Sequence, residues 1–416
     1  MRPLSISSAR KTAFSTLGDE FLEAPAETYP ALRRGPPVVW SDEEGGWLVH
    51  RYADVAAAMK DPRLAVTELA KAVRLLGARG GKDLEALAAV IDEVLFLRNP
   101  PVHEAGRQFL VAVLNDQPLS AHQGRIEEIA RRLLEDARQG APWDAAARYA
   151  DLLPPLFMAS LLGLEDAETL DAMSTVTEVT KSFDRGRSLR FYERVSKTVE
   201  TALGPIRAAV HRRRAAPAGD GLSRMIALSD AGFGLTDEVI ANRALFLLIG
   251  GVETTSALIG SAIAAIAERP DVAARIRAAP QLAAAAVEET LRFDGPVKQT
   301  SRIALSDLEI AGQPVRTGER LILLVGAAHR DPSVFPEPDR FDIDRAAEGI
   351  LGFGAGLHFC IGAALARLEA RVALKEILAA GELSLETQGR SWLRHRTLRR
   401  LEHLPLTINQ DLKGDQ

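Results

Sequence analysis

The side chain with the most distinctive surroundings in this 416-residue chain is that of Cys360, its only cysteine. Gly352, Gly354 and Gly356 precede it, and glycine allows backbone angles and close approaches that a Cβ atom forbids. An Ala- and Leu-rich run with helical periodicity begins at Ala363. We therefore expect Cys360 where a tight loop enters a helix. The free amide hydrogens and the dipole at a helix N-terminus favour a thiolate over a thiol.

A lone thiolate on a backbone loop is suited to donating one axial ligand to the iron of a large planar cofactor. A zinc or iron–sulfur site needs several Cys or His ligands at short spacing, and none accompany Cys360. The alternative is a buried free cysteine that packs as a small hydrophobic side chain. However, the stretch from Phe353 to Gly362 reads F-x-x-G-x-H-x-C-x-G. It closely resembles the haem-binding loop of cytochrome P-450 monooxygenases, which implies haem b bound through Cys360, with Gly354 and His358 beside it.

An acid and an alcohol interrupt a long apolar helical pattern that runs over residues 236–269. At 1.5 Å per residue such a helix is about 50 Å long, enough to cross a large domain. In its middle, Gly250 and Gly251 each cost about 1 kcal/mol relative to alanine. One interpretation is tight helix packing with an incidental charge at Glu253. The other is a helix against whose backbone a ligand lies, with Glu253 and Thr254 beside it.

This stretch is similar to the distal-helix motif of the same family, small-Gly-x-Asp/Glu-Thr-Thr. The resemblance implies that Gly250 and Gly251 contact the cofactor and that Glu253 and Thr254 are the catalytic pair that delivers protons. The Thr254 hydroxyl can hydrogen-bond to a carbonyl in the preceding turn and open the helix locally.

Three further side chains are candidates for holding the carboxylates of the cofactor. His103 and Arg107 are four residues apart on a predicted helix and share one face, which is ordinarily a solvated polar face. The Pro-Pro-x-His-x-x-x-Arg run around them resembles the family helix whose His and Arg hold a haem propionate, and Arg302 resembles a second clamp. The planar fork of arginine suits this task because it binds carboxylates in bidentate fashion.

Another pair of charges suggests a structural role. Glu289 and Arg292 are three residues apart, a spacing that usually gives a surface ion pair. In the family, however, Glu-x-x-Arg forms a buried network with the arginine of a Pro-x-Arg-Phe turn, which here is Arg340. The resemblance implies that this network fixes the loop that carries Cys360.

The resemblance also implies a hydrophobic small-molecule substrate, O2 as co-substrate and an external source of electrons. No flavin or iron–sulfur pattern is attached, so we expect a ferredoxin (or flavodoxin) with an NAD(P)H-dependent reductase. Arg367 and Arg371, four apart after Cys360, are candidates for docking an acidic carrier, since steering needs positive charge. The alternative is that they solvate a helix or pair with neighbours. The candidate pocket residues are Phe183, Leu245, Ile249, Gly250, Val297 and Thr397.

Composition, charge and hydropathy argue against several classes of protein. The formal net charge of -5 argues against general nucleic-acid binding. A single cysteine excludes an internal disulfide and is compatible with a reducing cytosol. The N-terminus lacks an apolar core of signal-peptide length, and the longest apolar stretch, Ala244–Val252, is shorter than the ~20 residues that span a bilayer. We therefore expect a cytoplasmic protein without a membrane span.

These features occur in the order expected for the family. The expected fold is one mainly helical α+β domain over about residues 30–408, with small sheets and with haem between the distal helix and the Cys360 loop. A partly irregular segment at 1–29 precedes this domain, and a tail at 409–416 follows it. Local patterns predict a β-hairpin within 36–52 and a helix, a glycine turn and a second helix within 65–98.

The activity implied is that of a haem-thiolate monooxygenase that hydroxylates or otherwise oxidises its substrate with two externally supplied electrons. Two alternatives stay open: an enzyme of peroxide-driven or phenol-coupling oxidation, and a non-catalytic haem sensor or binding protein. The Glu253–Thr254 pair counts against the peroxide-driven version, because peroxide already carries the protons, and against the sensor.

Overall fold

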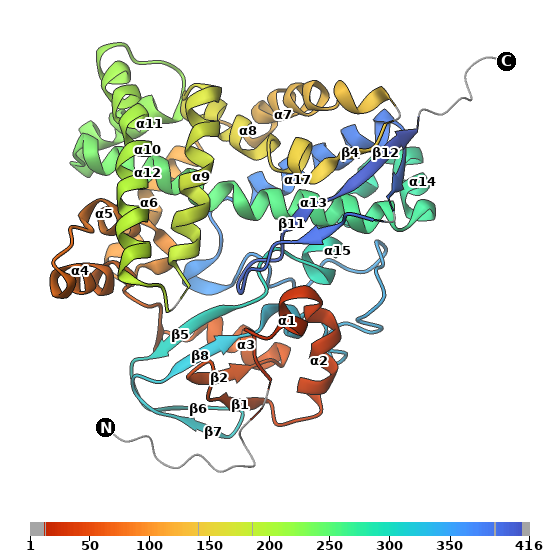
Figure 1. Ribbon diagram of the computed structural model, residues 1–416, viewed down its shortest axis with the longest axis horizontal. Helices are drawn as coiled ribbons and strands as arrows, with labels where there is room; N and C mark the ends of the chain where they lie inside the picture. The colour runs from red at the N-terminus through yellow and green to blue at the C-terminus, as the bar shows by residue number, and fades with distance from the viewer. Residues whose placement is uncertain (1–11, 13, 140, 185, 387, 410–416) are drawn as a thin grey trace.

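A computed structural model describes residues 12, 14–139, 141–184, 186–386 and 388–409. Helices fill the upper part of the molecule in Figure 1, and a sheet lies below them beside the first helices of the chain. The predicted mainly helical α+β fold class is confirmed.

Among the helices of the first half, α4, α5 and α9 pack against α10, α1 packs against α2, and α7 packs against α8. They are α1 (Asp19–Glu23), α2 (Pro25–Arg33), α3 (Tyr52–Lys60), α4 (Leu69–Gly80), α5 (Glu85–Glu93), α6 (Val102–Leu114), α7 (Leu119–Leu133), α8 (Leu153–Leu162), α9 (Asp166–Ser182) and α10 (Leu189–Ala215). In the second half, α17 packs against α13 and α15 and also against α7. This half contains α11 (Gly221–Leu228), α12 (Asp237–Gly251), α13 (Glu253–Ala267), α14 (Pro270–Ala278), α15 (Ala283–Phe293), α16 (Val325–Ala328) and α17 (Ala363–Ala380).

The largest sheet has the strand order β1-β2-β8-β5-β3, in which only β2 and β8 are parallel. Its strands are β1 (Val38–Ser41), β2 (Gly46–Val49), β3 (Leu64–Ala65), β5 (Thr300–Ala304) and β8 (Arg320–Leu323). The smaller sheets pair β6 (Leu308–Ile310) with β7 (Gln313–Val315), β12 (Pro405–Asn409) with β4 (Trp143–Asp144) and β9 (Glu382–Leu385), and β10 (Ser391–Trp392) with β11 (Leu401–His403).

One local prediction is confirmed and a second is confirmed in part. The β1–β2 hairpin turns at Gly45, whose φ of 60° lies in the left-handed region that favours glycine. Two helices, α4 and α5, are present within 65–98 as expected, but the expected glycine turn over 77–81 is not, because α4 continues through Gly80 and only Gly81 leaves it, as a left-handed cap. Helices α1 and α2 begin within the N-terminal segment that was expected to be partly irregular.

The long apolar pattern forms two helices, α12 and α13, that are interrupted only at Val252. By length and composition alone the stretch Asp237–Ala267 is able to cross a membrane, but 83% of its most apolar window is buried inside the protein. Such burial is typical of the central helix of a globular core. The fold therefore carries Glu253 and Thr254 into its interior.

Segments near the two ends of the chain are tied together by charged side chains. Arg396 forms an ion pair with Glu44, which is 352 residues away in the sequence. Arg394 pairs with Glu23 at 2.7 Å, and Arg399 donates a hydrogen bond to the backbone carbonyl of Glu23 at 2.7 Å. The segment that follows β10 is thereby held against α1 and the β1–β2 hairpin.

Candidate functional site

A cavity of about 2050 Å³ is lined by both the helical and the sheet-rich parts of the protein. Its walls include the α12–α13 junction, the loop before α17 and segments 299–303 and 395–398. Most residues that the sequence suggested for chemistry share this cavity: His103, Arg107, Phe183, Ile249, Gly250, Gly251, Glu253, Thr254, Val297, Arg302, Phe353, Gly354, His358, Cys360, Gly362 and Thr397.

The loop that carries Cys360 is tight for reasons visible in its backbone. Gly354 and Gly356 have φ values of 74° and 67°, which favour glycine. A Cβ atom on Gly356 would also lie 3.2 Å from the Cα of Lys60. The backbone N–H of Cys360 donates to the carbonyl of Phe353 at 2.9 Å and closes the loop. The sulfur is thus presented at the cavity wall just before α17 begins.

The helix N-terminus alone does not make the thiolate the favoured form of Cys360. Desolvation by the surrounding protein is the largest effect and raises the pKa of the Cys360 thiol, although the residue itself is exposed at the cavity wall. The backbone N–H of Gly362 and the positive charges of Arg107 and Arg367 lower this pKa, but they do not outweigh the desolvation. A metal ion bound to a thiol deprotonates it outright. The thiolate therefore depends on the metal that it binds.

The α12–α13 junction has the local opening expected from the sequence. The Thr254 hydroxyl donates to the carbonyl of Gly250 at 3.1 Å, and the regular helix is interrupted at Val252. Gly250 and Gly251 also lie on the cavity wall, so that a ligand in the cavity meets backbone there. This part of the wall combines a hydroxyl group with an exposed stretch of main chain.

Glu253 is 4% exposed and is held by two side chains that sequence analysis did not identify. One carboxylate oxygen, Oε1, accepts hydrogen bonds from Thr177 at 2.9 Å and from Arg400 at 3.2 Å. The other, Oε2, is buried without a hydrogen-bond partner in the described part of the chain. Arg400 also contacts Asp151 at 2.9 Å. Burial raises the pKa of Asp151, and the charge of Arg400 partly opposes this effect. Glu253 is therefore held at one oxygen and left free at the other.

One edge of the cavity gathers imidazole rings and guanidinium groups. The rings of His103 and His358 lie 4.6 Å apart in an edge-to-face arrangement, and neither Nδ1 atom has a partner among the described residues. Burial, followed by the charges of Arg302, His103 and Arg107, lowers the pKa of His358 to about 4. Both rings are therefore neutral at physiological pH, since burial also lowers the pKa of His103.

Arg302 lies at the same edge and is buried without a carboxylate partner in the described ranges. It donates to the Thr300 hydroxyl at 3.2 Å and to the Ser301 carbonyl at 2.9 Å, and burial lowers its pKa to about 10. A buried cation without a counter-charge is costly. The edge therefore fits a ligand that carries carboxylates of its own.

These features fit haem b better than a bare metal ion. Within the described ranges no cluster of three or more His, Cys, Asp or Glu side chains is able to hold a metal by itself. Cys360 offers one soft sulfur ligand, and the cavity edge offers donors to carboxylates through Arg302, Arg107, His103 and His358. A planar iron cofactor with propionate groups needs this combination.

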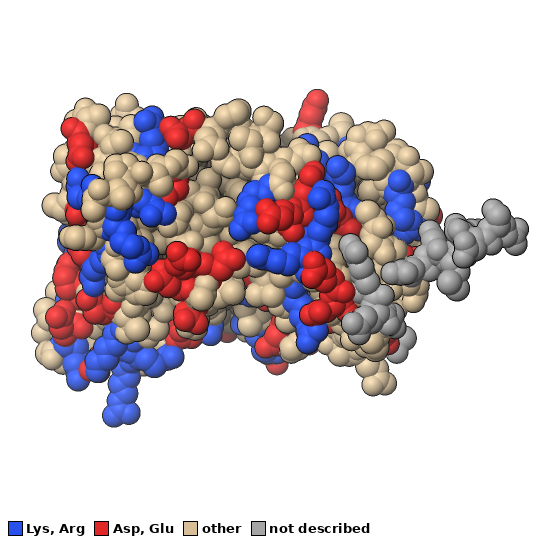
Figure 2. Space-filling model, turned by 90° about the horizontal axis from the view of Figure 1, so that it is seen from above, with Lys and Arg blue, Asp and Glu red and all other residues tan. Residues whose placement is uncertain are grey.

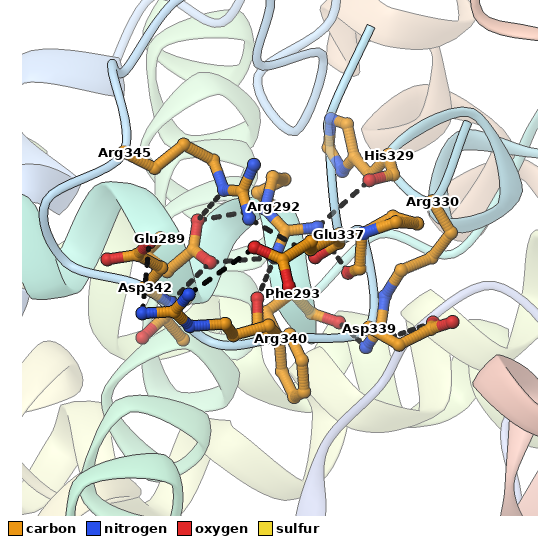
Figure 3. Close-up of polar contacts among 12 residues, drawn as sticks. Glu289, Arg292, Phe293, His329, Arg330, Glu337, Asp339, Arg340, Asp342 and Arg345 are labelled. Atoms are coloured by element: carbon orange, nitrogen blue, oxygen red, sulfur yellow. Dashed lines mark hydrogen bonds and ion pairs between the residues drawn. The ribbon is translucent and has the colours of Figure 1, made fainter. Parts of the chain in front are cut away.

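A buried charge network, shown in Figure 3, joins α15 to residues 329–345, which precede the Cys360 loop in the chain. Arg292 binds both oxygens of Glu289, at 2.8 and 2.7 Å, and both side chains are almost completely buried. Arg292 also donates to the backbone carbonyls of His329, Pro338 and Arg340. The network therefore joins α15 to the segment that leads into the loop.

The structure corrects the expected role of Arg340. Only its backbone carbonyl takes part in the network, because its side chain is 62% exposed and pairs with Glu337 at 3.3 Å. The side chain that reaches Glu289 instead is that of Arg345, with its Nε atom 3.5 Å from Oε2 of the glutamate. The sequence did not indicate that Arg345 would take the place of Arg340, because both arginines lie in the same irregular segment.

A second correction concerns the pocket. Leu245 is completely buried in the core around α10 and does not line the cavity, whereas its neighbours Phe246 and Leu247 do. One residue along a helix turns the side chain by about 100°. The predictions for Ile249 and Gly250 on the same helix agree with the cavity lining, so only Leu245 was misplaced.

The two candidate docking arginines differ from each other. Arg367 donates to Glu288, at 3.1 Å through Nη2, and its guanidinium lies 4.4 Å from the centre of the Phe353 ring. Arg371 is half-buried and makes no ion pair with a described residue. Arg367 is therefore engaged within the protein, and Arg371 keeps its charge available.

Comparison with known proteins agrees with this geometry. The family described as Cytochrome P450 matches residues 182–401 of this chain. The "Biotin biosynthesis cytochrome P450" of Bacillus subtilis (strain 168) is 30% identical over 401 residues, which cover 95% of this chain and 99% of that protein. The "Vitamin D(3) 25-hydroxylase" of Pseudonocardia autotrophica is 35% identical over 372 residues, which cover 86% of this chain and 87% of that protein.

The solved structures give the same result. The crystal structure of P450BioI in complex with hexadec-9Z-enoic acid ligated acyl carrier protein matches with a TM-score of 0.85 and 28% sequence identity, covering 94% of this chain and 100% of that chain. Together with the Cys360 loop, the α12–α13 junction and the cavity that they share, these matches show that the chain belongs to the cytochrome P450 family, whose members are monooxygenases that bind haem b through a cysteine thiolate and use O2.

Proposed function

We propose that this cytochrome P450 hydroxylates, or otherwise oxidises, a hydrophobic small molecule with two electrons supplied from outside. The observation that carries the proposal is that Cys360 and the Glu253–Thr254 pair line one cavity. When bound through the Cys360 sulfur, haem supplies the reductive activation of O2 and the oxidising power. Arg302, Arg107 and the His103–His358 pair would hold its carboxylates.

The protein's own part in the reaction is to position groups, to exclude water and to move protons. Oε2 of Glu253 has no hydrogen-bond partner among the described residues. It is thus free to take up a proton and, after a side-chain rotation, donate it to Oγ1 of Thr254 as this hydroxyl releases its own proton into the cavity. Asp151 shares Arg400 with Glu253 and is 24% exposed, so it connects the acid to the solvent side. A positioned acid of this kind typically contributes about 10²–10⁴-fold to a rate.

The test of this function is reconstitution of the haem-loaded protein with a ferredoxin, an NAD(P)H-dependent ferredoxin reductase and a panel of hydrophobic compounds under ¹⁸O₂. We expect a product that carries one ¹⁸O atom and requires both the reductant and the carrier. A product formed only with added hydrogen peroxide would favour peroxide-driven oxidation. A coupled product without ¹⁸O would favour phenol coupling, and no turnover in any condition would favour a haem sensor.

The same proposal includes a cytoplasmic location and a separate small redox protein, a ferredoxin or flavodoxin, that docks near α17. On the face shown in Figure 2, positive and negative side chains are interleaved. We expect steering of an acidic carrier to depend on local charges near the Cys360 loop. Arg371 on α17 is the candidate whose charge is not engaged within the protein, while Leu357 in the loop is 39% exposed and available for apolar contact.

Charge reversal tests this docking site. We expect Arg371→Glu to slow reduction by the ferredoxin about tenfold at low salt, because steering raises association rates by roughly 10–10³-fold. The effect should shrink at about 1 M salt, where the Debye length is only ~3 Å. The matched control is Arg190→Glu, an exposed residue of α10, and Figure 1 shows α10 on the other side of the helical part from α14 and β12, which α17 lies closer to. Stopped-flow reduction rates that are equal in all three proteins at every salt concentration would place the docking site elsewhere.

A further inference from the structure

Arg367 lies on α17 and is held on one side by a carboxylate and on another by an aromatic ring. Its guanidinium donates to both oxygens of Glu288, through Nε and, at 3.1 Å, through Nη2. The same guanidinium lies 4.4 Å from the centre of the Phe353 ring. The side chain of Arg367 is 36% exposed and that of Glu288 only 19%, so the ion pair is partly shielded from solvent. An arginine that makes a bidentate pair and stacks on a ring has its planar group fixed in one orientation.

Phe353 is bonded directly to the backbone of Cys360. Its carbonyl accepts the N–H of Cys360 at 2.9 Å, which closes the loop. The residue before it, Gly352, rests on α15, since a Cβ atom there would lie 3.4 Å from Cδ2 of Leu291. The Phe353 ring packs against the hydrophobic core that contains Leu291. A displacement of Phe353 would therefore move the backbone that carries the sulfur.

Two adjacent glutamates of α15 bind the segments before and after the loop. Glu289 binds Arg292, which donates to backbone carbonyls within 329–340, as Figure 3 shows. Glu288 binds Arg367, which follows the loop in the chain. Neighbouring residues of a helix point about 100° apart, so the two carboxylates reach in different directions. One helix thus supports both ends of the segment that presents Cys360.

A second arginine contacts the other end of the same loop. Arg107 on α6 donates to the backbone carbonyl of Phe359 at 2.6 Å, next to Cys360. Desolvation is the largest influence on the pKa of Cys360 and raises it, whereas the N–H of Gly362 and the charges of Arg107 and Arg367 lower it. The charge of Arg367 is therefore close enough to act on the sulfur as well as on the ring at the start of the loop.

We propose that Arg367 is a positioning residue, which together with Glu288 holds Phe353, and through Phe353 the Cys360 sulfur, in place for the haem iron. This role differs from the docking of a redox carrier that its charge alone suggested. The inference goes beyond the proposed oxidation, because it concerns neither the substrate nor the carrier. It rests on Cys360 as the haem ligand, which Cys360→Ser tests separately.

The test compares Arg367→Lys and Glu288→Gln with the wild-type protein, each loaded with haem. Lysine keeps the positive charge but lacks the planar fork that binds two carboxylate oxygens and stacks on a ring. The first measurement is the iron–sulfur stretching band in the resonance Raman spectrum of the ferric protein. We expect this band to shift or broaden in both variants, because the sulfur is no longer held in one position.

The second measurement is the rate at which the red-shifted band of the ferrous carbonyl complex is lost in dilute urea. We expect the loss to be at least about fivefold faster in both variants, since a cation–ring contact and a partly exposed ion pair together contribute roughly a factor of 5–10. Haem content and the circular dichroism of the native proteins should stay at wild-type values, because the rest of the core is untouched.

The matched control is Glu376→Gln. Glu376 is also on α17 and is paired with an arginine, Arg131 at 3.0 Å, but this pair joins α17 to α7 and not to the loop. Both measurements should be unchanged in it. Wild-type behaviour of either Arg367→Lys or Glu288→Gln would overturn the inference, and so would an equal change in the control. Loss of the native fold in the two variants would overturn it too, since the pair would then support the whole domain.

Failure of the underlying assignments is recognised separately. A carbonyl band that persists in Cys360→Ser would mean that the ligand itself is wrongly assigned. If that band is lost in Cys360→Ser while Arg367→Lys behaves as the wild type, only the role of Arg367 is wrong. The proposed oxidation is judged by ¹⁸O incorporation, on which neither spectroscopic measurement depends.

Discussion

Replacement of Cys360 by serine is expected to abolish both the strongly red-shifted absorption band of the ferrous carbonyl complex and the oxidation of substrate. The loop itself should persist, because the bond that closes it runs between backbone atoms of Cys360 and Phe353. The substitution thus exchanges the ligand atom and little else. A serine oxygen is a harder donor than thiolate sulfur and does not push electron density toward iron in the way that favours O–O cleavage.

The control for this experiment is Leu357→Ala in the same loop. Leu357 is 39% exposed and does not line the cavity, so its truncation should leave the carbonyl band in place. The measurement is the difference spectrum of the reduced protein with and without carbon monoxide, normalised to bound haem. An unchanged band in the Cys360→Ser variant would show that the Cys360 sulfur is not the ligand of the haem iron.

Thr254→Ala should separate consumption of reductant from formation of product. The Thr254 hydroxyl is placed on the cavity wall by its bond to the Gly250 carbonyl, and the carboxylate of Glu253, the next residue in the chain, has one oxygen without a partner among the described residues. Without this hydroxyl, protons no longer reach the reacting oxygen in an ordered way, and hydrogen peroxide is released in place of product. Since positioned proton transfer contributes about 10²–10⁴-fold, we expect the product formed per reductant to fall at least about tenfold.

The matched variant is Thr254→Ser, which keeps the hydroxyl and removes only the methyl group. It should restore most of the coupling between reductant and product, whereas a purely structural role of the threonine methyl would leave it impaired. Reductant, peroxide and product are measured in the same reaction. Unaltered coupling in Thr254→Ala would show that the hydroxyl is not part of the proton route.

The parts of the fold that sequence patterns predicted are those with strong local causes. The hairpin around Gly45, the break after α4 at Gly81 and the long apolar pattern across α12 and α13 each follow from backbone or packing preferences of nearby residues. The Cys360 loop was predictable for the same reason, because its glycines and its following helix are contiguous in sequence.

What the sequence did not reveal depends on contacts between distant segments. Arg400 binds Glu253 from the far end of the chain, and the double arginine before β11 was the only hint of it. Arg345 replaces Arg340 beside Glu289 because an irregular segment folds back over the pair, which no periodicity records. The direction in which the pKa of Cys360 is shifted also depends on desolvation by the surrounding protein, which is a property of the assembled fold.

The ion pair between Arg396 and Glu44 has a consequence for how the protein folds. Arg396 reaches Glu44 across 352 residues, so this contact closes nearly the whole chain into one loop. Contacts of such sequence separation form late and slow folding. During synthesis the β1–β2 hairpin is made early. Glu44 is therefore unable to pair with Arg396 until almost all of the chain has left the ribosome. A polypeptide that ends before residue 394 would already contain α12, α13 and the Cys360 loop, but it would lack segment 395–398 of the cavity wall.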